Sequence, residues 1–293
     1  MCGRYVIARA AGDLMDALGI KMPDADGTED AYEQLELRPD YNVAPTKDVP
    51  IVLERLIEPG DRAGGVENSS GAAGYRRELH VARWGLVPIW AKDLSFSSRA
   101  FNARSETVTS KPTFRSAVKA RRCAIPVDGY YEWLAPEKPG GRKRPFFVHR
   151  KDGAPIVFAG LYEWWKDPNP KQDSAPHVAG DSNTGDSGEE NPWVLSCTIL
   201  TCASPSHEAP GMAGELGLLH DRLPVPLGDE AALSAWLDPE SQDAATLVAE
   251  AVAHAYDSLG EWEMHEVGPA VGNVRNNGPE LITPIDNTDP PLF

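Results

Sequence analysis

The sequence has no long apolar run: no stretch reaches the roughly eighteen consecutive apolar residues that a membrane-spanning helix requires. Its first ten residues, MCGRYVIARA, lack both the apolar segment and the cleavage site of a secretory signal. These two absences exclude a helical membrane protein. They predict a cytoplasmic protein without a membrane partner.

Cysteine is scarce as well, with four residues in a chain of 293, namely Cys2, Cys123, Cys197 and Cys202. None belongs to a CxxC pair, and the chain is much larger than the modules that disulfides hold together. We therefore expect a reducing compartment and no metal site. The last three cysteines are expected to be small buried apolar residues.

Positive charge is also in deficit, because 28 Lys and Arg face 44 Asp and Glu and leave a net charge of −16. Taken alone, this balance argues against a nucleic-acid partner, since binding phosphates requires cations. The cations are nevertheless concentrated: residues 99–151 hold thirteen Lys or Arg against four Asp or Glu, a net +9 that leaves −25 elsewhere. This block is either a local anion-binding face or a solvated basic surface without a partner.

Two stretches contain almost no residues that could contribute to a core. Residues 58–75 are rich in Gly, Ser and Ala, whereas residues 166–192 have almost no apolar side chains and carry a net charge of −4. Neither buries enough surface to offset the entropy lost on ordering, so both are predicted to be flexible insertions. They interrupt strand pairs without separating independent cores. The chain is therefore predicted to form one domain, residues 1–293.

Between the insertions, short runs of β-branched and aromatic residues predict strands. The predicted strands cover residues 50–53, 79–84, 124–127, 145–149, 156–162, 194–201 and 263–267. A Pro-Gly-Gly sequence within residues 137–144 predicts a hairpin loop. Apolar spacing predicts fewer helices, over residues 10–18, 105–119, 229–237 and 244–252. This pattern is typical of an α+β domain with a mostly antiparallel sheet.

The first residues place Cys2 directly after the initiator methionine. Methionine is normally removed before a small residue, and its removal would give Cys2 a free α-amine beside its thiol. The α-amine has an ordinary pKa of about 7.7–8.0, so part of it is neutral and nucleophilic at cellular pH. Such an aminothiol attacks an aldehyde to form an imine, and the thiol then closes a five-membered thiazolidine. The alternative is an incidental second residue.

Three further segments carry polar residues suited to a reactive site. Asn102 and Arg104 stand at alternate positions of a strand end and so share one face, unless they only precede a helix capped by Ser105. Glu132 lies among aromatic residues, a setting that favours proton transfer, or else it is a surface residue paired with an Arg. His220 is suited to proton transfer near neutral pH, although a lone histidine is more often structural.

Two other segments are candidates for a binding surface. The Asn- and Gly-rich residues 271–278 are suited to a loop that lines a polar site, although a plain surface turn has the same composition. Trp84 and Trp90 offer aromatic faces for stacked bases, with core packing as the alternative for each.

Together these segments resemble the SOS response-associated peptidase (SRAP) family of abasic-site processing proteins. The matching motifs are MCGRY at 1–5, YNVAPT at 41–46, RWGLVPIW at 83–90, FNARSET at 101–107, CAIPVDGYYEW at 123–133, HDRLPV at 220–225 and VGNVRNNGPELI at 271–282. Each motif is weak alone, but seven in family order are specific. The resemblance implies a single α+β domain with a barrel-like β core and a positively charged groove for single-stranded DNA.

The resemblance also implies roles for the reactive residues. Cys2 would be the nucleophile, and Asn102 would position its amine and the opened sugar. Glu132 would move protons, and His220 would help to open the deoxyribose ring and assist reversal of the crosslink.

It further implies contacts with single-stranded DNA that contains an abasic site. Arg4 and Arg104 would hold phosphates, Trp84 would stack near the lesion, and Asn42 would line the site. The protein would act in the DNA damage response as a monomer, associated with the nucleoid, without a cofactor or metal. Two other functions stay open: an N-terminal-Cys peptidase or amidohydrolase, of which removal of Met1 is a limited form, and a noncatalytic single-strand sensor.

Overall fold

The computed structural model describes residues 2–20, 37–56, 74–136, 138–169 and 192–285. Its strands are β1 (Tyr5–Ile7), β2 (Asp40–Val43), β3 (Asp48–Leu56), β4 (Tyr75–Trp84), β5 (Asn102–Arg104), β6 (Arg122–Val127), β7 (Gly129–Leu134), β8 (Arg144–Arg150), β9 (Ile156–Lys166), β10 (Trp193–Ala203), β11 (Arg222–Pro224) and β12 (Trp262–Glu266). Its α-helices are α1 (Ala11–Ala17), α3 (Ala117–Ala120), α4 (Met212–Leu219), α5 (Glu230–Leu237) and α6 (Ala244–Ser258). Short 3-10 helices cover Leu94–Arg99, Leu259–Glu261, Pro269–Gly272 and Pro279–Ile282.

The larger sheet closes on itself. Its strands follow the order β10-β4-β3-β6-β9, and β9 pairs with β10 again, so five strands form a barrel. Only β4 and β5 run parallel to β10, whereas the other pairings within this sheet are antiparallel. The barrel-like, mostly antiparallel core predicted from the sequence is therefore confirmed.

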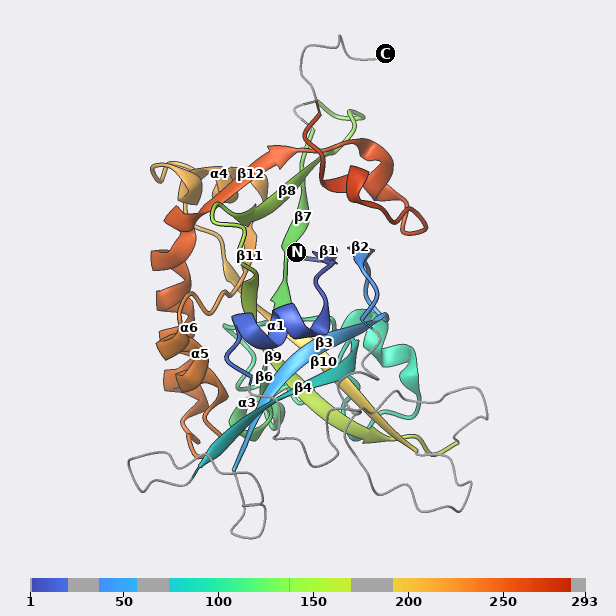
Figure 1. The fold of residues 1–293 in the computed structure, drawn as a ribbon, viewed down its shortest axis with the longest axis vertical. Helices are drawn as coiled ribbons and strands as arrows, with labels where there is room; N and C mark the ends of the chain where they lie inside the picture. The colour runs from blue at the N-terminus through green and yellow to red at the C-terminus, as the bar shows by residue number, and fades with distance from the viewer. Residues whose placement is uncertain (1, 21–36, 57–73, 137, 170–191, 286–293) are drawn as a thin grey trace.

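A second sheet lies over one end of the barrel, and helices α5 and α6 run along the side of the molecule (Figure 1). This sheet is antiparallel throughout, in the order β12-β8-β7-β1-β2, and it places β1 between β7 and β2. Tyr5 pairs with Tyr130 on one side and with Val43 on the other. The start of the described chain is therefore held in the interior of a sheet.

All seven predicted strands are present, each extended by a few residues or shifted by one. The hairpin predicted over residues 137–144 joins β7 to β8, as expected. The helices predicted over residues 10–18, 229–237 and 244–252 correspond to α1, α5 and α6. The predicted flexible insertions fall mainly on residues 57–73 and 170–191, which lie outside the described residues.

The helix predicted over residues 105–119 is wrong. Turns occupy residues 105–116, and only α3 at the end of the segment is helical. Pro112 explains the difference: proline has no amide hydrogen to donate within a helix, and it disfavours helical geometry at Lys111 before it. The segment therefore crosses the surface as consecutive turns. No helix in the described part of the chain is long and apolar enough to cross a bilayer.

Gly85 allows the chain to turn closely past the 3-10 helix at the end of β4. Its φ is +130°, and a Cβ there would lie 2.2 Å from the carbonyl oxygen of Ser97. We expect Gly85→Ala to lower the free energy of unfolding by about 3 kcal/mol, because the contact is with rigid backbone. Urea unfolding measures this change.

The matched control is Gly12→Ala in α1, where a Cβ meets nothing within 4 Å. This change should leave stability unchanged or raise it by up to about 1 kcal/mol, because alanine favours a helix over glycine. Equal effects of the two substitutions would contradict the close approach at Gly85.

Candidate active site

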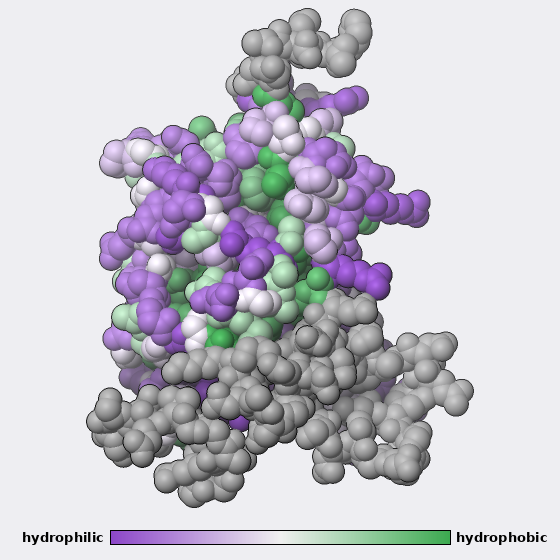
Figure 2. Space-filling model, in the orientation of Figure 1, coloured by the Kyte–Doolittle hydropathy of each residue, from purple (hydrophilic) through white to green (hydrophobic). Residues whose placement is uncertain are grey.

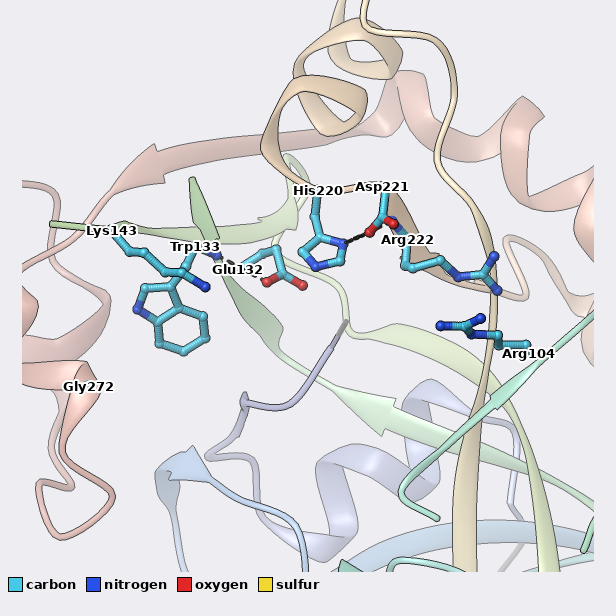
Figure 3. Close-up of a pocket in the computed structure, with 8 residues that line it drawn as sticks. All are labelled: Arg104, Glu132, Trp133, Lys143, His220, Asp221, Arg222 and Gly272. Atoms are coloured by element: carbon cyan, nitrogen blue, oxygen red, sulfur yellow. Dashed lines mark hydrogen bonds and ion pairs between the residues drawn. The ribbon is translucent and has the colours of Figure 1, made fainter. Parts of the chain in front are cut away.

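A pocket of about 570 Å³ combines side chains from both sheets. Its lining residues are Arg104, Glu132, Trp133, Lys143, His220, Asp221, Arg222 and Gly272. Glu132 and His220 lie near its middle, with Lys143 and Trp133 on one side and Arg104 and Arg222 on the other (Figure 3). Cations therefore border a central pair of proton-transfer groups, an arrangement suited to a polar, anionic ligand.

Glu132 reaches the pocket because β7 alternates its faces. The neighbouring Tyr131 packs against Phe147, with ring centroids 5.3 Å apart, and donates a hydrogen bond to the carbonyl of Tyr41. Glu132 therefore points the opposite way, toward the pocket. Glu132 is only 5% exposed, and its Oε1 accepts a hydrogen bond of 3.2 Å from the backbone N–H of Trp133. The structure thus gives this carboxylate a largely dry setting.

His220 follows the last turn of α4 and precedes β11. Its Nδ1 lies 2.9 Å from the backbone N of Arg222 and 2.7 Å from Oδ1 of Asp221. One nitrogen cannot accept from the amide and donate to the carboxylate at the same time. The Asp221 side chain is 85% exposed, so water screens its attraction, and we assign Nδ1 as the acceptor. In this tautomer the Nε2 atom carries the proton.

Cys2 and Asn102 are joined directly. The side-chain amide of Asn102 donates a hydrogen bond of 2.7 Å to the carbonyl oxygen of Cys2. The other end of this side chain, Oδ1, is buried and accepts no hydrogen bond from any residue that the structure describes. The Cys2 thiol is wholly buried, and burial raises its pKa, with the negative charge of Glu132 adding to the effect. Cys2 does not itself line the pocket, but it lies within the electrostatic reach of Glu132.

Arg4 and Asn42 are engaged in holding the C-terminal loop. Arg4 donates to Oδ1 of Asn42 at 2.6 Å and to the carbonyl of Val271 at 2.7 Å, and its guanidinium lies 5.9 Å from the Trp133 ring centre. Asn42 is fully buried and donates to the carbonyls of Asn273 and Asn276. The structure therefore makes both residues supports of the pocket wall, whereas the sequence had suggested direct contacts with DNA.

Trp84 requires a correction. Its indole is completely buried, packs 4.8 Å from the Tyr5 ring and donates a hydrogen bond to the carbonyl of Phe101. A ring without exposed surface presents no face to a base, so Trp84 belongs to the core in this structure. Trp90 of the same motif is 55% exposed and packs edge-on against Phe96.

Four pocket residues were missed in the sequence: Trp133, Lys143, Asp221 and Arg222. Trp133 and Asp221 directly follow the predicted site residues Glu132 and His220, so their positions in the sequence could have predicted them. Lys143 belongs to the hairpin loop between two strands, and only the pairing of β7 with β8 shows that it returns to the site. In the part of the chain that the structure describes, no group of three or more His, Cys, Asp or Glu could hold a metal.

The fold and the pocket define the class of protein. Residues 1–274 match the family model described as SOS response associated peptidase (SRAP), so the chain belongs to this family.

Relatives with curated names match over almost the whole chain. An abasic site processing protein, YoqW, of Bacillus subtilis is 31% identical over 284 residues, which are 96% of this chain and 99% of the relative. The abasic site processing protein HMCES of Xenopus tropicalis is 26% identical, over 97% of this chain and 78% of the relative.

Solved structures share the fold. A crystal structure from Bacteroides thetaiotaomicron has a TM-score of 0.62 at 19% identity and covers 97% of this chain and all of its own. A second, from Bordetella bronchiseptica, has a TM-score of 0.54 at 21% identity, over 91% of this chain and all of its own.

The hydrogen bonds of Asn42 predict that its truncation releases the loop after Val271. Asn42→Ala should lower the free energy of unfolding by about 2–3 kcal/mol, because it removes the hydrogen bonds to the carbonyls of Asn273 and Asn276 and the acceptor of the Arg4 guanidinium. Amide exchange in residues 271–278 should accelerate. The control Asn169→Ala, at an exposed position, should change neither quantity. Unchanged exchange in Asn42→Ala would contradict this role.

Proposed function

We propose that this protein binds single-stranded DNA at abasic sites and crosslinks itself to the opened deoxyribose through Cys2, after Met1 has been removed. The product is a thiazolidine that shields the lesion from strand cleavage during the DNA damage response. Several relatives carry the name abasic site processing protein, which supports the substrate class. The observation that carries the proposal is the hydrogen bond from Asn102 to Cys2 beside the pocket of Glu132 and His220.

The geometry supports a role for Asn102 in orienting the amine. Its amide group already fixes the carbonyl of Cys2, and its buried Oδ1 has no donor among the described residues. A buried acceptor without a donor is costly, so a group that donates to it is favoured there. The liberated α-amine of Cys2 supplies such N–H groups. In this proposal, Oδ1 of Asn102 accepts from the amine and directs its lone pair toward the sugar.

The first step opens the ring of the abasic sugar. The closed form is a hemiacetal, in which the C1′ hydroxyl loses its proton as the bond from C1′ to the ring oxygen breaks. Nε2–H of His220, in the tautomer assigned above, donates a hydrogen bond to the departing ring oxygen and stabilises the charge that develops there. Glu132 accepts the proton of the C1′ hydroxyl and passes it to the ring oxygen, so that the products are the C4′ hydroxyl and an open aldehyde.

The aminothiol then reacts in two additions. The amine attacks C1′ and forms a carbinolamine. Glu132 moves a proton from the nitrogen to the hydroxyl, which leaves as water, and an imine remains. The thiol sulfur next bonds to the same carbon while its proton passes to the nitrogen, and the five-membered ring closes. Aldehyde and aminothiol thus combine with the loss of one water, and no oxidant or reductant is required.

The charges around Cys2 favour attack by the amine before the thiol, and they disfavour peptidase chemistry. A cysteine peptidase needs a thiolate, which forms where nearby positive charge lowers the pKa of the thiol. In the chain that still carries Met1, burial and the negative charge of Glu132 raise the pKa of the Cys2 thiol instead. A neutral thiol is adequate for closing a ring on an imine, because the reactive imine is formed first by the amine.

An adduct assay tests the proposal. Single-stranded DNA with one abasic site should give a species that survives denaturation, whereas Cys2→Ala should give none that is stable. The control Cys123→Ala removes another buried thiol that does not line the pocket, and it should react normally. A complex on a native gel without a denaturation-stable species would support a noncatalytic sensor, and cleavage of peptides without DNA would support a peptidase. Either result would contradict the proposal.

Glu132→Gln tests the proton transfers separately from binding. We expect the rate of adduct formation to fall by about 10² to 10⁴-fold, because glutamine cannot accept a proton. The Kd for DNA with a tetrahydrofuran analogue, which cannot open, should hardly change.

The matched control for Glu132→Gln is Glu163→Gln. Glu163 is also 5% exposed but pairs with Arg121, outside the pocket. Its substitution should leave the adduct rate near that of the unaltered protein. A Glu132→Gln protein that reacts at full rate would assign the proton transfers to another group.

A further inference from the structure

Lys143 and Arg104 reach the pocket from opposite directions. Lys143 directly precedes β8 and lies beside the end of β7, because Trp133 pairs with Pro145 and Leu134 with Arg144. Arg104 ends β5, where it pairs with Thr201 of β10 in the other sheet. Figure 3 shows the two side chains on opposite sides of Glu132 and His220. The two cations therefore bracket the proposed reaction centre, and each is held by a different sheet.

These two differ from the other cations near the site in what they contact. Arg222 directs both terminal nitrogens onto the carboxylate of Glu106, at 2.6 and 2.9 Å. Arg4 donates to Asn42 and to the carbonyl of Val271. Neither Arg104 nor Lys143 forms an ion pair or a side-chain hydrogen bond with any residue that the structure describes. Both side chains are exposed, so their charges are available to a ligand.

The cations that line the pocket are suited to a polar, negatively charged polymer. On the face of the molecule drawn in Figure 2, hydrophilic residues lie on both flanks and apolar residues gather between them. A strand of nucleic acid presents one negative phosphate on each side of every sugar. Arg104 and Lys143 place positive charge on opposite sides of the proton-transfer pair, where a strand crossing the pocket would carry its phosphates.

We propose that Lys143 binds the phosphate on one side of the abasic sugar while Arg104 binds the phosphate on the other side. The strand then crosses the pocket with the sugar over Glu132 and His220. This inference rests on the proposed function and assigns to Lys143 the second phosphate contact that the sequence had suggested for Arg4. Arg104 can bind its phosphate with two nitrogens, whereas Lys143 acts as a point charge. These two phosphate contacts, called the clamp below, position C1′ for attack. Each contact binds the phosphate on a different side of the abasic sugar.

Strands with one neutral backbone linkage test which flanking phosphate each cation binds. The adduct rate is measured on three single strands with one abasic site: one natural, one with a methylphosphonate on the 5′ side of the lesion and one with it on the 3′ side. On natural DNA, Lys143→Ala should lower the rate about fivefold, the effect of one exposed ionic contact. On one of the two neutral strands, Lys143→Ala and the unaltered protein should react equally. The adduct rate of Arg104→Ala should equal that of the unaltered protein only on the other neutral strand.

Two further variants separate charge from other effects. Lys143→Arg keeps the charge and should retain most of the rate. Lys138→Ala, in the same hairpin but outside the pocket lining, should react normally. The dependence of binding on salt should become shallower by about 0.7 in its logarithmic slope for Lys143→Ala, as expected when one phosphate contact with single-stranded DNA is lost.

The outcomes separate this inference from the proposed function. If the unaltered protein forms no adduct, the proposed function itself fails. If it forms the adduct and Lys143→Ala reacts like Lys138→Ala, only the clamp is overturned. The clamp is also overturned if Lys143→Ala reacts more slowly than the unaltered protein on both neutral strands. It is overturned as well if Lys143→Arg lowers the adduct rate as much as Lys143→Ala does. The last result would point to chemistry of the lysine amine in place of its charge.

Discussion

The site depends on the position of β1 inside the smaller sheet. This strand pairs with β7 on one side and with β2 on the other, and the backbone N–H of Tyr131 also donates to the carbonyl of Arg4. The chain leading to Cys2 therefore has little freedom, and Asn102 fixes the Cys2 carbonyl from the other sheet. Because Glu132 lies on β7, the pairing that holds β1 also sets the distance from Cys2 to the carboxylate.

Burial of Cys2 bears on which of its two nucleophiles, the amine or the thiol, attacks first. The thiol is wholly enclosed, and the dry surroundings and the nearby Glu132 disfavour its ionised form. A group in this setting is a poor initial nucleophile but a suitable second one. In the proposed function, this setting favours first attack by the amine, and the thiol then closes a ring on a carbon already bonded to the same residue. Hydrogen bonds from Asn42 and Arg4 then fix the far wall of the pocket.

Much of the fold was predictable, because β-branched and aromatic runs identify strands wherever burial is continuous. Barrel strands such as β6 and β10 are buried along most of their length and so have the strongest signal. Strands of three or four residues, such as β1 and β2, were missed because so short a run has no visible period. The false helix over residues 105–119 arose because its apolar spacing outweighed Pro112.

The site was predictable in part. The motifs predicted Cys2, Asn102, Glu132 and His220 as site residues, and the structure places the last two in the pocket lining. Residue type alone could not show which polar side chains face the pocket. Trp84 is core, and Arg4 is held by carbonyls from residues more than 260 positions away in the chain. Such long-range contacts have no local signature in the sequence.

The most direct test of the central claim is the mass of the DNA adduct after digestion of both components. The account predicts that the modified peptide begins at Cys2 without Met1. Its mass should equal that of the peptide plus the open abasic fragment minus one water, and its thiol should be inert to alkylation. A modified peptide that retains Met1, or attachment at a lysine such as Lys143, would contradict the account.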